Sequence, residues 1–403
     1  MRLIGNKTKL LGEIEGFLAR RGVTQGTFLD VFAGTASVGR HFRALGFRVR
    51  TNDLMCSSFV RQVAYISLDR YPELSAVREL GPVRRFLRGR SGRRALDELG
   101  APAPGAAGLQ EVLAYLNRGL APRRGLMARQ YAEGGEAGRL FFSEENGAWI
   151  DAAHHQIVCW RRRGALTEPE LHLLLTSLLE AADRTANISG TYGAFLKQLQ
   201  VSACAQAQLR PSPLDTRSPA GRAYRGDGNA LVRRLPVDVL YVDPPYNHRQ
   251  YVKNYHVIEV LAELHTVADL RAYEAEIYGK TGLRRFDDRL SDYCKKTARR
   301  GSSPCEAAFR DLVAQARAEH IVISYSEEGI LGREEIGAAL AAAAGQPRYD
   351  FARDHEEISY KRFRSDKDGE GRSYRVLEER SRDEVREWLF YVHKPRRRAR
   401  IAS

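Results

Sequence analysis

The chain has 403 residues, enough for two or three domains and for a core that needs no disulfide or metal to hold it together. Hydrophobic residues make up 43% and charged residues 28% of the sequence, a balance that excludes wholesale disorder. Lys and Arg number 64 against 50 Asp and Glu, and the net charge of +14 favours a polyanionic partner, with nucleic acid the first candidate.

Cysteine use and hydropathy favour a cytosolic protein. The five cysteines form no CxxC motif and no Cys/His pair at metal-binding spacing, and an odd number at wide gaps is typical of a reducing compartment. Residues 1–17 lack the apolar core of a signal peptide, and no stretch approaches the ~18 apolar residues of a membrane span. We therefore expect a soluble, cytoplasmic protein with no metal site and no membrane segment.

The first sixty residues have the pattern of a nucleotide-binding α/β unit. Apolar residues at helical spacing between positions 10 and 18 predict an amphipathic helix. Residues 27–33 form an apolar run typical of a buried parallel strand, followed by a turn at 34–37 and a helix to about residue 45. A second strand is predicted at 47–53 and ends in Asp53. Nucleotide-binding units of this kind carry a ribose-binding acid ~20 residues after the turn, and Asp53 lies close to that distance from the turn at 34–37.

The next stretch, residues 61–186, is rich in arginine and predicts helices. Its clearest element is a helix at 167–186, because Thr167 and Glu170 form a capping box and Pro169 falls in the first turn. Leucines between positions 171 and 179 then mark one apolar face. We interpret this region as a largely helical insertion that docks on the α/β core.

The α/β pattern returns after residue 187. Residues 237–242 predict a buried strand that leads directly into the tetrad at 243–246, and residues 320–325 predict another, followed by a helix at 334–344. A late strand at 387–393 follows a charged, hairpin-like stretch with no crossover helix, so it should be antiparallel. Basic residues alternate with aromatic ones at 360–375, and the chain ends in a basic tail at 394–400.

The tetrad Asp243, Pro244, Pro245 and Tyr246 carries the strongest chemical signal. An exocyclic amine on a nucleobase is a poor nucleophile, because its lone pair is delocalised into the ring. The Asp243 carboxylate and the Pro244 carbonyl can each accept one amine hydrogen, and together they stabilise the positive charge that develops on the nitrogen during methyl transfer. The prolines fix the backbone, and Tyr246 offers a ring on which an extruded base can stack.

With its motifs in this order, the chain resembles the amino-methylating DNA methyltransferases, and more narrowly the adenine-N6 enzymes of the Dam-like D12 class, which includes type II modification methylases. Residues 1–11 are similar to the N-terminal cofactor motif of that group, 30–39 to its glycine-containing loop and 243–251 to its catalytic motif. Residues 141–197 are similar to type II members, though less specifically. The chain departs at Asn6, where some members carry a second glycine, and in the 32–37 loop, which has fewer glycines than usual.

The resemblance implies a fold, a cofactor and a set of residues. The fold would be a Rossmann-like α/β methyltransferase sheet, mostly parallel with a late antiparallel strand, that carries a largely helical DNA-recognition insertion. The cofactor would be S-adenosyl-L-methionine. By carry-over from the family, Lys7 and the loop residues Phe32, Ala33 and Gly34 would hold its methionine end, Asp53 its ribose hydroxyls and Asp227 its adenine amine, while Asp243 would lie near its amino group. The tetrad 243–246 would act on an adenine flipped out of double-stranded DNA, with no metal involved.

The resemblance also implies a division of the chain and a set of partners. The expected segments are 1–60 for cofactor binding, 61–186 for target recognition, 187–265 for catalysis, 266–319 as a helical, charged insertion and 320–403 as the rest of the core. Double-stranded DNA would be the substrate. A cognate restriction endonuclease would be the partner of such a modification enzyme.

Several alternatives stay open on the sequence alone. A cytosine-N4 enzyme fits less well, because that group usually has Ser in place of Asp243, and an RNA adenine methyltransferase or a catalytically idle DNA-binding relative would share much of the pattern. A dehydrogenase would explain the opening unit but not the tetrad. Among single positions, Asp53 could simply be a strand-end or helix-capping acid, and Asp227 an ordinary turn residue between glycines. Residues 249–255 could form a partly exposed helix and residues 190–197 a plain polar loop.

Overall fold

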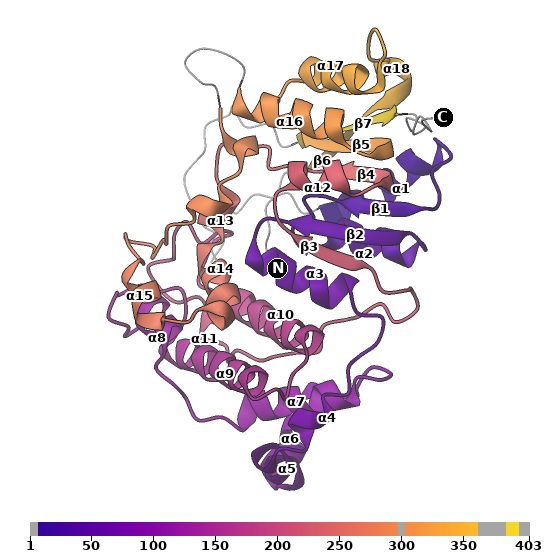
Figure 1. The fold of residues 1–403 in the computed structure, drawn as a ribbon. Helices are drawn as coiled ribbons and strands as arrows, with labels where there is room; N and C mark the ends of the chain where they lie inside the picture. Colours follow the sequence, from indigo (N-terminus) through magenta and orange to yellow (C-terminus); the bar gives the residue numbers. More distant parts are fainter. Residues whose placement is uncertain (1–6, 297–302, 362–383, 395–403) are drawn as a thin grey trace.

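The computed structural model describes residues 7–296, 303–361 and 384–394. It has an α/β part built on a sheet and a helical part that extends from one side of it (Figure 1). The sheet takes its strands from both ends of the chain, whereas the helical part comes mainly from the middle.

The described residues form a seven-stranded sheet in the order β3-β2-β1-β4-β5-β7-β6. Strands β1 to β5 pair in parallel, and β7 runs antiparallel to both β5 and β6. The strands are β1 (Thr27–Asp30), β2 (Arg48–Asp53), β3 (Arg222–Arg225), β4 (Val237–Val242), β5 (Ala318–Ser326), β6 (His355–Lys361) and β7 (Glu384–His393). Strand order reverses between β1 and β4, and open parallel sheets bind ligands outside the carboxyl ends of their strands at such a point.

Helices cover both faces of the sheet, as the apolar runs of its central strands require. Along β4, Val239 and Tyr241 pack on one face, and Leu240 and Val242 on the other. The first face is covered by the 3-10 helix η1 (Lys7–Leu10), α1 (Leu11–Ala19) and α2 (Ser37–Ala44). The second is covered by α12 (Gly228–Arg234), α16 (Pro304–Gln315) and α17 (Arg333–Ala344).

A separate hydrophobic cluster forms the core of the helical part. Helix α3 (Cys56–Ile66) joins it to the sheet, because α3 contacts β2 and β3 and also packs against α10 (Glu168–Thr185) and α14 (His256–Glu263). The remaining helices are α4 (Ser75–Arg78), α5 (Gly81–Arg88), α6 (Arg90–Leu99), α7 (Ala107–Arg118), α8 (Leu126–Tyr131), α9 (Glu144–Arg162), α11 (Val201–Cys204), α13 (Tyr251–Asn254), α15 (Leu270–Ala275), α18 (Phe351–Asp354) and the 3-10 helices η2 (Leu264–Thr266), η3 (Asp287–Arg289) and η4 (Asp292–Cys294).

The predicted mixed sheet is confirmed, including the antiparallel direction of the late strand. The capping box of α10 is also confirmed, because the Thr167 N–H and hydroxyl both donate to Glu170 Oε2 at 2.7 Å. The first strand is shorter than predicted, ending at Asp30, because the chain turns away from the sheet there. Strands β3 and β6 were not predicted, since charged and polar residues hide the strand pattern at the two edges of the sheet.

Three sequence predictions concern residues that the structure does not describe. Positions 1–6 of the N-terminal motif, the basic and aromatic stretch from 362 to 375 and the tail from 395 to 400 all lie outside the described residues. In the ranges that are described, no helix combines the length and the apolar character needed to cross a bilayer.

Candidate active site

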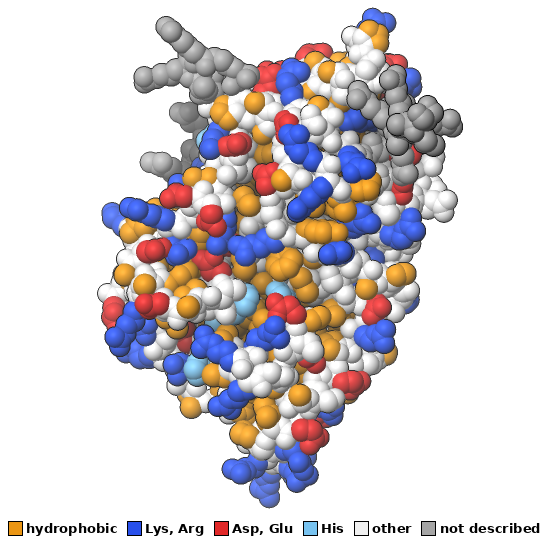
Figure 2. Space-filling view, in the orientation of Figure 1, with side chains coloured by type: hydrophobic (Ala, Val, Ile, Leu, Met, Phe, Trp, Pro, Cys, Tyr) orange, Lys and Arg blue, Asp and Glu red, His pale blue; other side chains and the backbone are white. Residues whose placement is uncertain are grey.

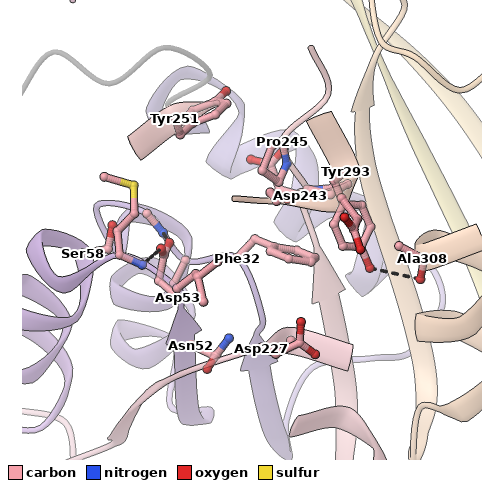
Figure 3. A pocket seen from close by; sticks show the side chains of 18 of the residues that line it. Phe32, Asn52, Asp53, Ser58, Asp227, Asp243, Pro245, Tyr251, Tyr293 and Ala308 are labelled. Atoms are coloured by element: carbon pink, nitrogen blue, oxygen red, sulfur yellow. Dashed lines mark hydrogen bonds between the residues drawn. The ribbon is translucent and has the colours of Figure 1, made fainter. Parts of the chain in front are cut away.

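A cavity of about 600 Å³ lies at the carboxyl ends of β1, β2 and β4, where the strand order reverses. The ten residues to which the sequence assigned a cofactor or catalytic role all line this one cavity, although they come from five separate stretches of the chain. They are Lys7, Phe32, Ala33, Gly34, Asp53, Asp227, Asp243, Pro244, Pro245 and Tyr246. Figure 3 shows several of them around the cavity. The structure therefore brings the predicted set together, while the role of each member stays a prediction.

Asp53 ends β2 and is held by main-chain N–H groups. Its Oδ2 accepts from Gly34 N–H at 2.9 Å, and its Oδ1 accepts from Met55 N–H at 2.9 Å. Gly34 has a φ of 51°, a conformation that favours glycine and that turns its N–H toward the carboxylate. Burial raises the pKa of Asp53 to about 6, and the two N–H donors oppose that rise.

The loop beside Asp53 is fixed by further main-chain contacts. Asn52 is buried and donates from its amide to the carbonyls of Val31 and Gly226, so it ties the loop after β1 to the turn before α12. In that turn Asp227 is the N-cap of α12 and accepts from Ala230 N–H at 2.7 Å. Asp227 therefore caps a helix, and the same side chain lines the cavity.

Asp30, the first residue of the motif at 30–39, is a further buried acid at the site. It ends β1, is 2% exposed and also lines the cavity. Burial, together with the charges of Asp243 and Asp53, raises the pKa of Asp30 well above its ordinary value. The carboxyl edge of the sheet therefore places Asp30, Asp53 and Asp243 around one cavity, and burial is the main cause that raises the pKa of each.

Asp243 follows β4 directly and lies against the Lys7 ammonium. Lys7 Nζ is 3.2 Å from Asp243 Oδ1 and 2.7 Å from Glu387 Oε1, and both the lysine and the glutamate are buried. Although burial lowers it, the two carboxylates together raise the pKa of Lys7 well above its ordinary value. Burial raises the pKa of Asp243 to about 7, with Lys7 lowering it and Glu387 raising it.

Tyr246, at the end of the tetrad, is half-buried. Its ring meets the Tyr325 ring edge-on at a centroid distance of 6.3 Å, and Lys7 Nζ lies 5.6 Å from its centroid. The carbonyl of Tyr246 accepts from Ile330 N–H at 3.0 Å, which ties the turn to the loop after β5. A ring held in this way beside Asp243 is suited to receive a planar base.

Residues 289–293, which carry no recognisable motif in the sequence, form another part of the cavity wall. The ring of Tyr293 packs edge-on against Phe32 at a centroid distance of 4.9 Å. Its hydroxyl lies 2.7 Å from Asn229 Oδ1 and 3.2 Å from the Ala308 carbonyl oxygen, and Figure 3 shows the second contact. Gln250 and Ser291 exchange two hydrogen bonds of 2.9 and 2.8 Å, which tie this segment to the catalytic turn. No local motif announces the segment, because its place depends on contacts between distant parts of the chain.

Other residues considered from the sequence divide between the cavity and elsewhere. Gln250 and Tyr251 line the cavity, whereas Tyr255 is fully buried and Arg249 and Lys253 are exposed. The loop 190–197 is not part of the cavity wall.

The prediction that no Cys/His pair occurs at metal-binding spacing is wrong. His155 Nε2 lies 3.5 Å from Cys159 Sγ, because the two residues are one turn apart on α9. Two ligands do not make a metal site, and the described part of the chain holds no group of three or more His, Cys, Asp or Glu that could bind a metal ion.

The sequence of the chain is similar to that of a known enzyme family. A family model for the D12 class of N6 adenine-specific DNA methyltransferases matches residues 3–87 and 107–336. The chain is 32% identical over 374 residues to the Type II methyltransferase M.NlaIII of Neisseria lactamica, covering 91% of this chain and 93% of that protein.

Two other relatives are longer than the chain. It is 30% identical over 397 residues to the Type II methyltransferase M.FokI of Planomicrobium okeanokoites and 29% identical over 400 residues to the modification methylase StsI of Streptococcus sanguinis. These alignments cover 98% of the chain but only 53% and 52% of the relatives, so the chain spans about half the length of these two proteins. The match to the family model covers well over half of the sequence, and the chain therefore belongs to the D12 class of N6 adenine-specific DNA methyltransferases.

Proposed function

We propose that this protein transfers a methyl group from S-adenosyl-L-methionine to N6 of adenine within a specific sequence of double-stranded DNA. The observation that carries the proposal is the position of Asp243 and Tyr246 on the wall of the same cavity as Asp53 and the 32–34 loop. A methyl donor and a flipped base that share this cavity would have their reacting atoms in contact.

The cavity has the chemistry that this cofactor requires. Asp53 offers a carboxylate to the two ribose hydroxyls, and Phe32 and Tyr293 provide aromatic surface beside Asp227 for the adenine ring and its amine. The start of α2 and the Phe32–Gly34 loop suit the methionine carboxylate, because a helix N-terminus presents free N–H groups. A lysine ammonium has three N–H donors, so Lys7 keeps one for the methionine end while it contacts Asp243 and Glu387.

When bound, S-adenosyl-L-methionine supplies an electrophilic methyl group, and the residues of this chain prepare the amine that receives it. Lys7 lies against Asp243 Oδ1, which leaves Oδ2 to accept one hydrogen of the adenine amine. The Pro244 carbonyl accepts the other, and both acceptors stabilise the charge that develops on nitrogen. Tyr246 stacks on the base and compensates for part of the stacking that the base loses on leaving the duplex.

We assign DNA recognition to the helical part. Helices α5 and α6 form an arginine-rich end of the molecule, where Lys and Arg side chains gather on the surface (Figures 1 and 2). The family model does not match residues 88–106, which include α6. This part of the arginine-rich end is therefore a feature of this chain that the family model does not share. Phosphate contacts made by such side chains would position the duplex, and a few others in 61–186 would read its bases.

We further propose that the protein works in the cytoplasm as the modification enzyme of a restriction–modification system. Relatives named as type II methyltransferases and modification methylases support this role. The partner would be an endonuclease that cuts the same sequence when it is unmethylated. Cells that express such a nuclease should survive only when this chain is present and active.

A direct assay tests the activity. The purified chain is incubated with S-adenosyl-L-methionine and unmethylated genomic DNA, and the digested nucleosides are identified by mass spectrometry. We expect N6-methyladenine, and sequencing of the modified DNA then gives the recognition site. N4-methylcytosine instead, or methylation of RNA alone, would refute the proposal, and an absence of any transfer would support the catalytically idle alternative.

A further inference from the structure

Glu387 is a second carboxylate on the Lys7 ammonium, and the reaction proposed above does not use it. It lies on β7, 380 residues from Lys7, and its Oε1 is 2.7 Å from the lysine Nζ. The Ser324 hydroxyl on β5 donates to the same oxygen. Glu387 is fully buried and is not part of the cavity wall, whereas Asp243 on the other side of the ammonium is.

Apart from Lys7 and Ser324, the packing around Glu387 does not call for an acid at this position. Leu389 and Tyr391, two and four residues further along β7, pack in the hydrophobic cluster under α1 and α2, so Glu387 projects from the same face of the sheet. Its Oε2 is buried without a hydrogen-bond partner among the described residues. A buried carboxylate with an incomplete set of partners is unfavourable for stability.

The arrangement has a consequence for Asp243. If Lys7 had Asp243 as its sole partner, its full charge would hold that carboxylate as a weak acceptor. Glu387 lies against the same ammonium, and its negative charge offsets part of the positive potential of Lys7 at Asp243, which makes Asp243 more basic. The same direction appears in the pKa of Asp243, which Glu387 raises.

We propose that Glu387 is a positioning residue for methyl transfer, which anchors the Lys7 ammonium behind Asp243 and keeps Asp243 a strong acceptor for the target amine. The inference rests on the proposed function. Glu387 acts through Lys7 and contacts neither the cofactor nor the base.

Several ionisable groups face Asp243 besides this pair, and they set the background against which Glu387 acts. They are Asp30 on β1, Tyr241 on β4 and Tyr251 on α13. All of them stay in place when Glu387 is replaced, so a change in the titration of Asp243 reports the loss of one carboxylate from β7.

The test is the pH dependence of methylation in the full chain, measured as single-turnover rates at saturating cofactor and duplex DNA. In Glu387→Gln the positive charge of Lys7 is no longer offset by a second carboxylate, so the acid limb of the profile should move down by about 1 to 3 pH units. The plateau rate should fall, by less than the roughly 100-fold loss expected when Asp243 itself is replaced. Lys7→Gln should move the same limb upward, because Asp243 then faces Glu387 without the ammonium between them.

The matched control is Asp238→Asn, which removes a carboxylate at the opposite end of β4, where it accepts from the Thr27 N–H and hydroxyl. It should lower thermal stability and leave the limb unmoved. Glu387→Asp keeps the charge but withdraws it from Lys7 by one methylene, and it gives a smaller downward shift if Glu387→Gln does not fold.

Opposite shifts in the Glu387 and Lys7 variants would establish the role, since loss of packing alone moves neither limb. A limb in folded, active Glu387→Gln or Glu387→Asp that coincides with that of the unaltered protein would overturn it. An absence of methylation by the unaltered protein would refute the proposed function and this inference with it.

Discussion

The two ends of the cavity hold their carboxylates in different ways. Asp53 accepts from two main-chain N–H groups nearby in sequence, that of Met55, 2 residues away, and that of Gly34, 19 residues away. Asp243 is held by the Lys7 side chain, which is itself anchored by a glutamate 380 residues from it. Main-chain donors remain when a side chain is replaced, proline excepted, whereas an ion pair between distant side chains can be removed or retuned. The carboxylate at the cofactor end is therefore fixed by local main-chain contacts, whereas the one at the catalytic end depends on side chains that only the tertiary structure brings together.

Replacing Asp243 by Asn should have the largest effect on this comparison. The shape is kept, but a neutral amide replaces the charged acceptor where the amine becomes cationic, so the rate of methyl transfer should fall by roughly 10²–10³. DNA binding should change little. Single-turnover rates and a DNA titration check both points, and an equal loss in rate and DNA affinity would contradict the assigned role.

Replacing Asp53 by Ala should act at the other end and on binding alone. The loss of a charged acceptor for two hydroxyls should weaken cofactor affinity by about 1.5–3 kcal/mol, with DNA affinity unchanged. Calorimetric titration with S-adenosyl-L-methionine measures this directly. An unchanged affinity would remove Asp53 from the cofactor site.

Replacing Tyr246 by Ala separates base capture from chemistry within the catalytic turn. Stacking is worth roughly 1–3 kcal/mol per base, so the flipped base should be held less often. A mismatch or an abasic site opposite the target makes extrusion easier and should partly rescue Tyr246→Ala but not Asp243→Asn. Equal rescue of both variants would show that the roles are divided wrongly.

The raised pKa of Asp53 predicts a pH dependence of cofactor binding. Its pKa of about 6 lies above the ordinary value of 3.8, so the carboxylate becomes protonated as the pH falls through 6. The ribose hydroxyls need the charged form, and cofactor affinity should fall by up to about tenfold per pH unit below that point. Between pH 3.8 and 6 the folded state binds more protons at this site than the unfolded state, so its contribution to stability decreases as the pH rises.

The same calorimetric titration, repeated from about pH 5 to 8, checks this dependence on either side of the pKa. In Asp53→Asn, which serves as the control, the affinity should be lower and should not change around pH 6. A wild-type affinity that is flat across this range would contradict the assignment.

The smallest expected effect lies far from both ends of the cavity. Arg85 and Arg88 on α5 are exposed, and the described residues give neither an ion pair, whereas Arg310 on α16 is paired with Glu306 at 2.8 Å. If either α5 arginine binds a phosphate, its replacement by Ala should lower the slope of log affinity against log salt by roughly 0.9. Arg310→Ala is the matched control and should leave the slope unchanged. Identical slopes in all three variants would place the DNA elsewhere.

Exchange of residues 61–186 with those of a relative of different specificity tests the recognition assignment as a whole. The methylated sequence should move with the exchanged segment, because base readout depends on the side chains that the segment carries. If the site stays the same, recognition lies elsewhere, with residues 266–320 the next region to exchange. Sequencing of modified DNA from cells that express each chimera gives the answer.

The sequence by itself determined the parts of this protein that depend on neighbours along the chain. The strand that ends in Asp53, the capping box at Thr167 and the tetrad after β4 each follow from residues a few positions apart, whose backbone preferences and periodicity are local. The edge strands β3 and β6 could not be predicted from the sequence, because a half-exposed strand needs no apolar run.

Only the tertiary structure decided what lies behind and across the cavity. Glu387 appears in the sequence as one acid in a late strand, and Tyr293 as an aromatic in a charged stretch. Sheet pairing between β5 and β7 brings Glu387 under Lys7, and the contacts of Tyr293 with Phe32 and Asn229 bring it to the wall. The physical reason is that charge and stacking act through space, and the fold alone sets which distant residues become neighbours.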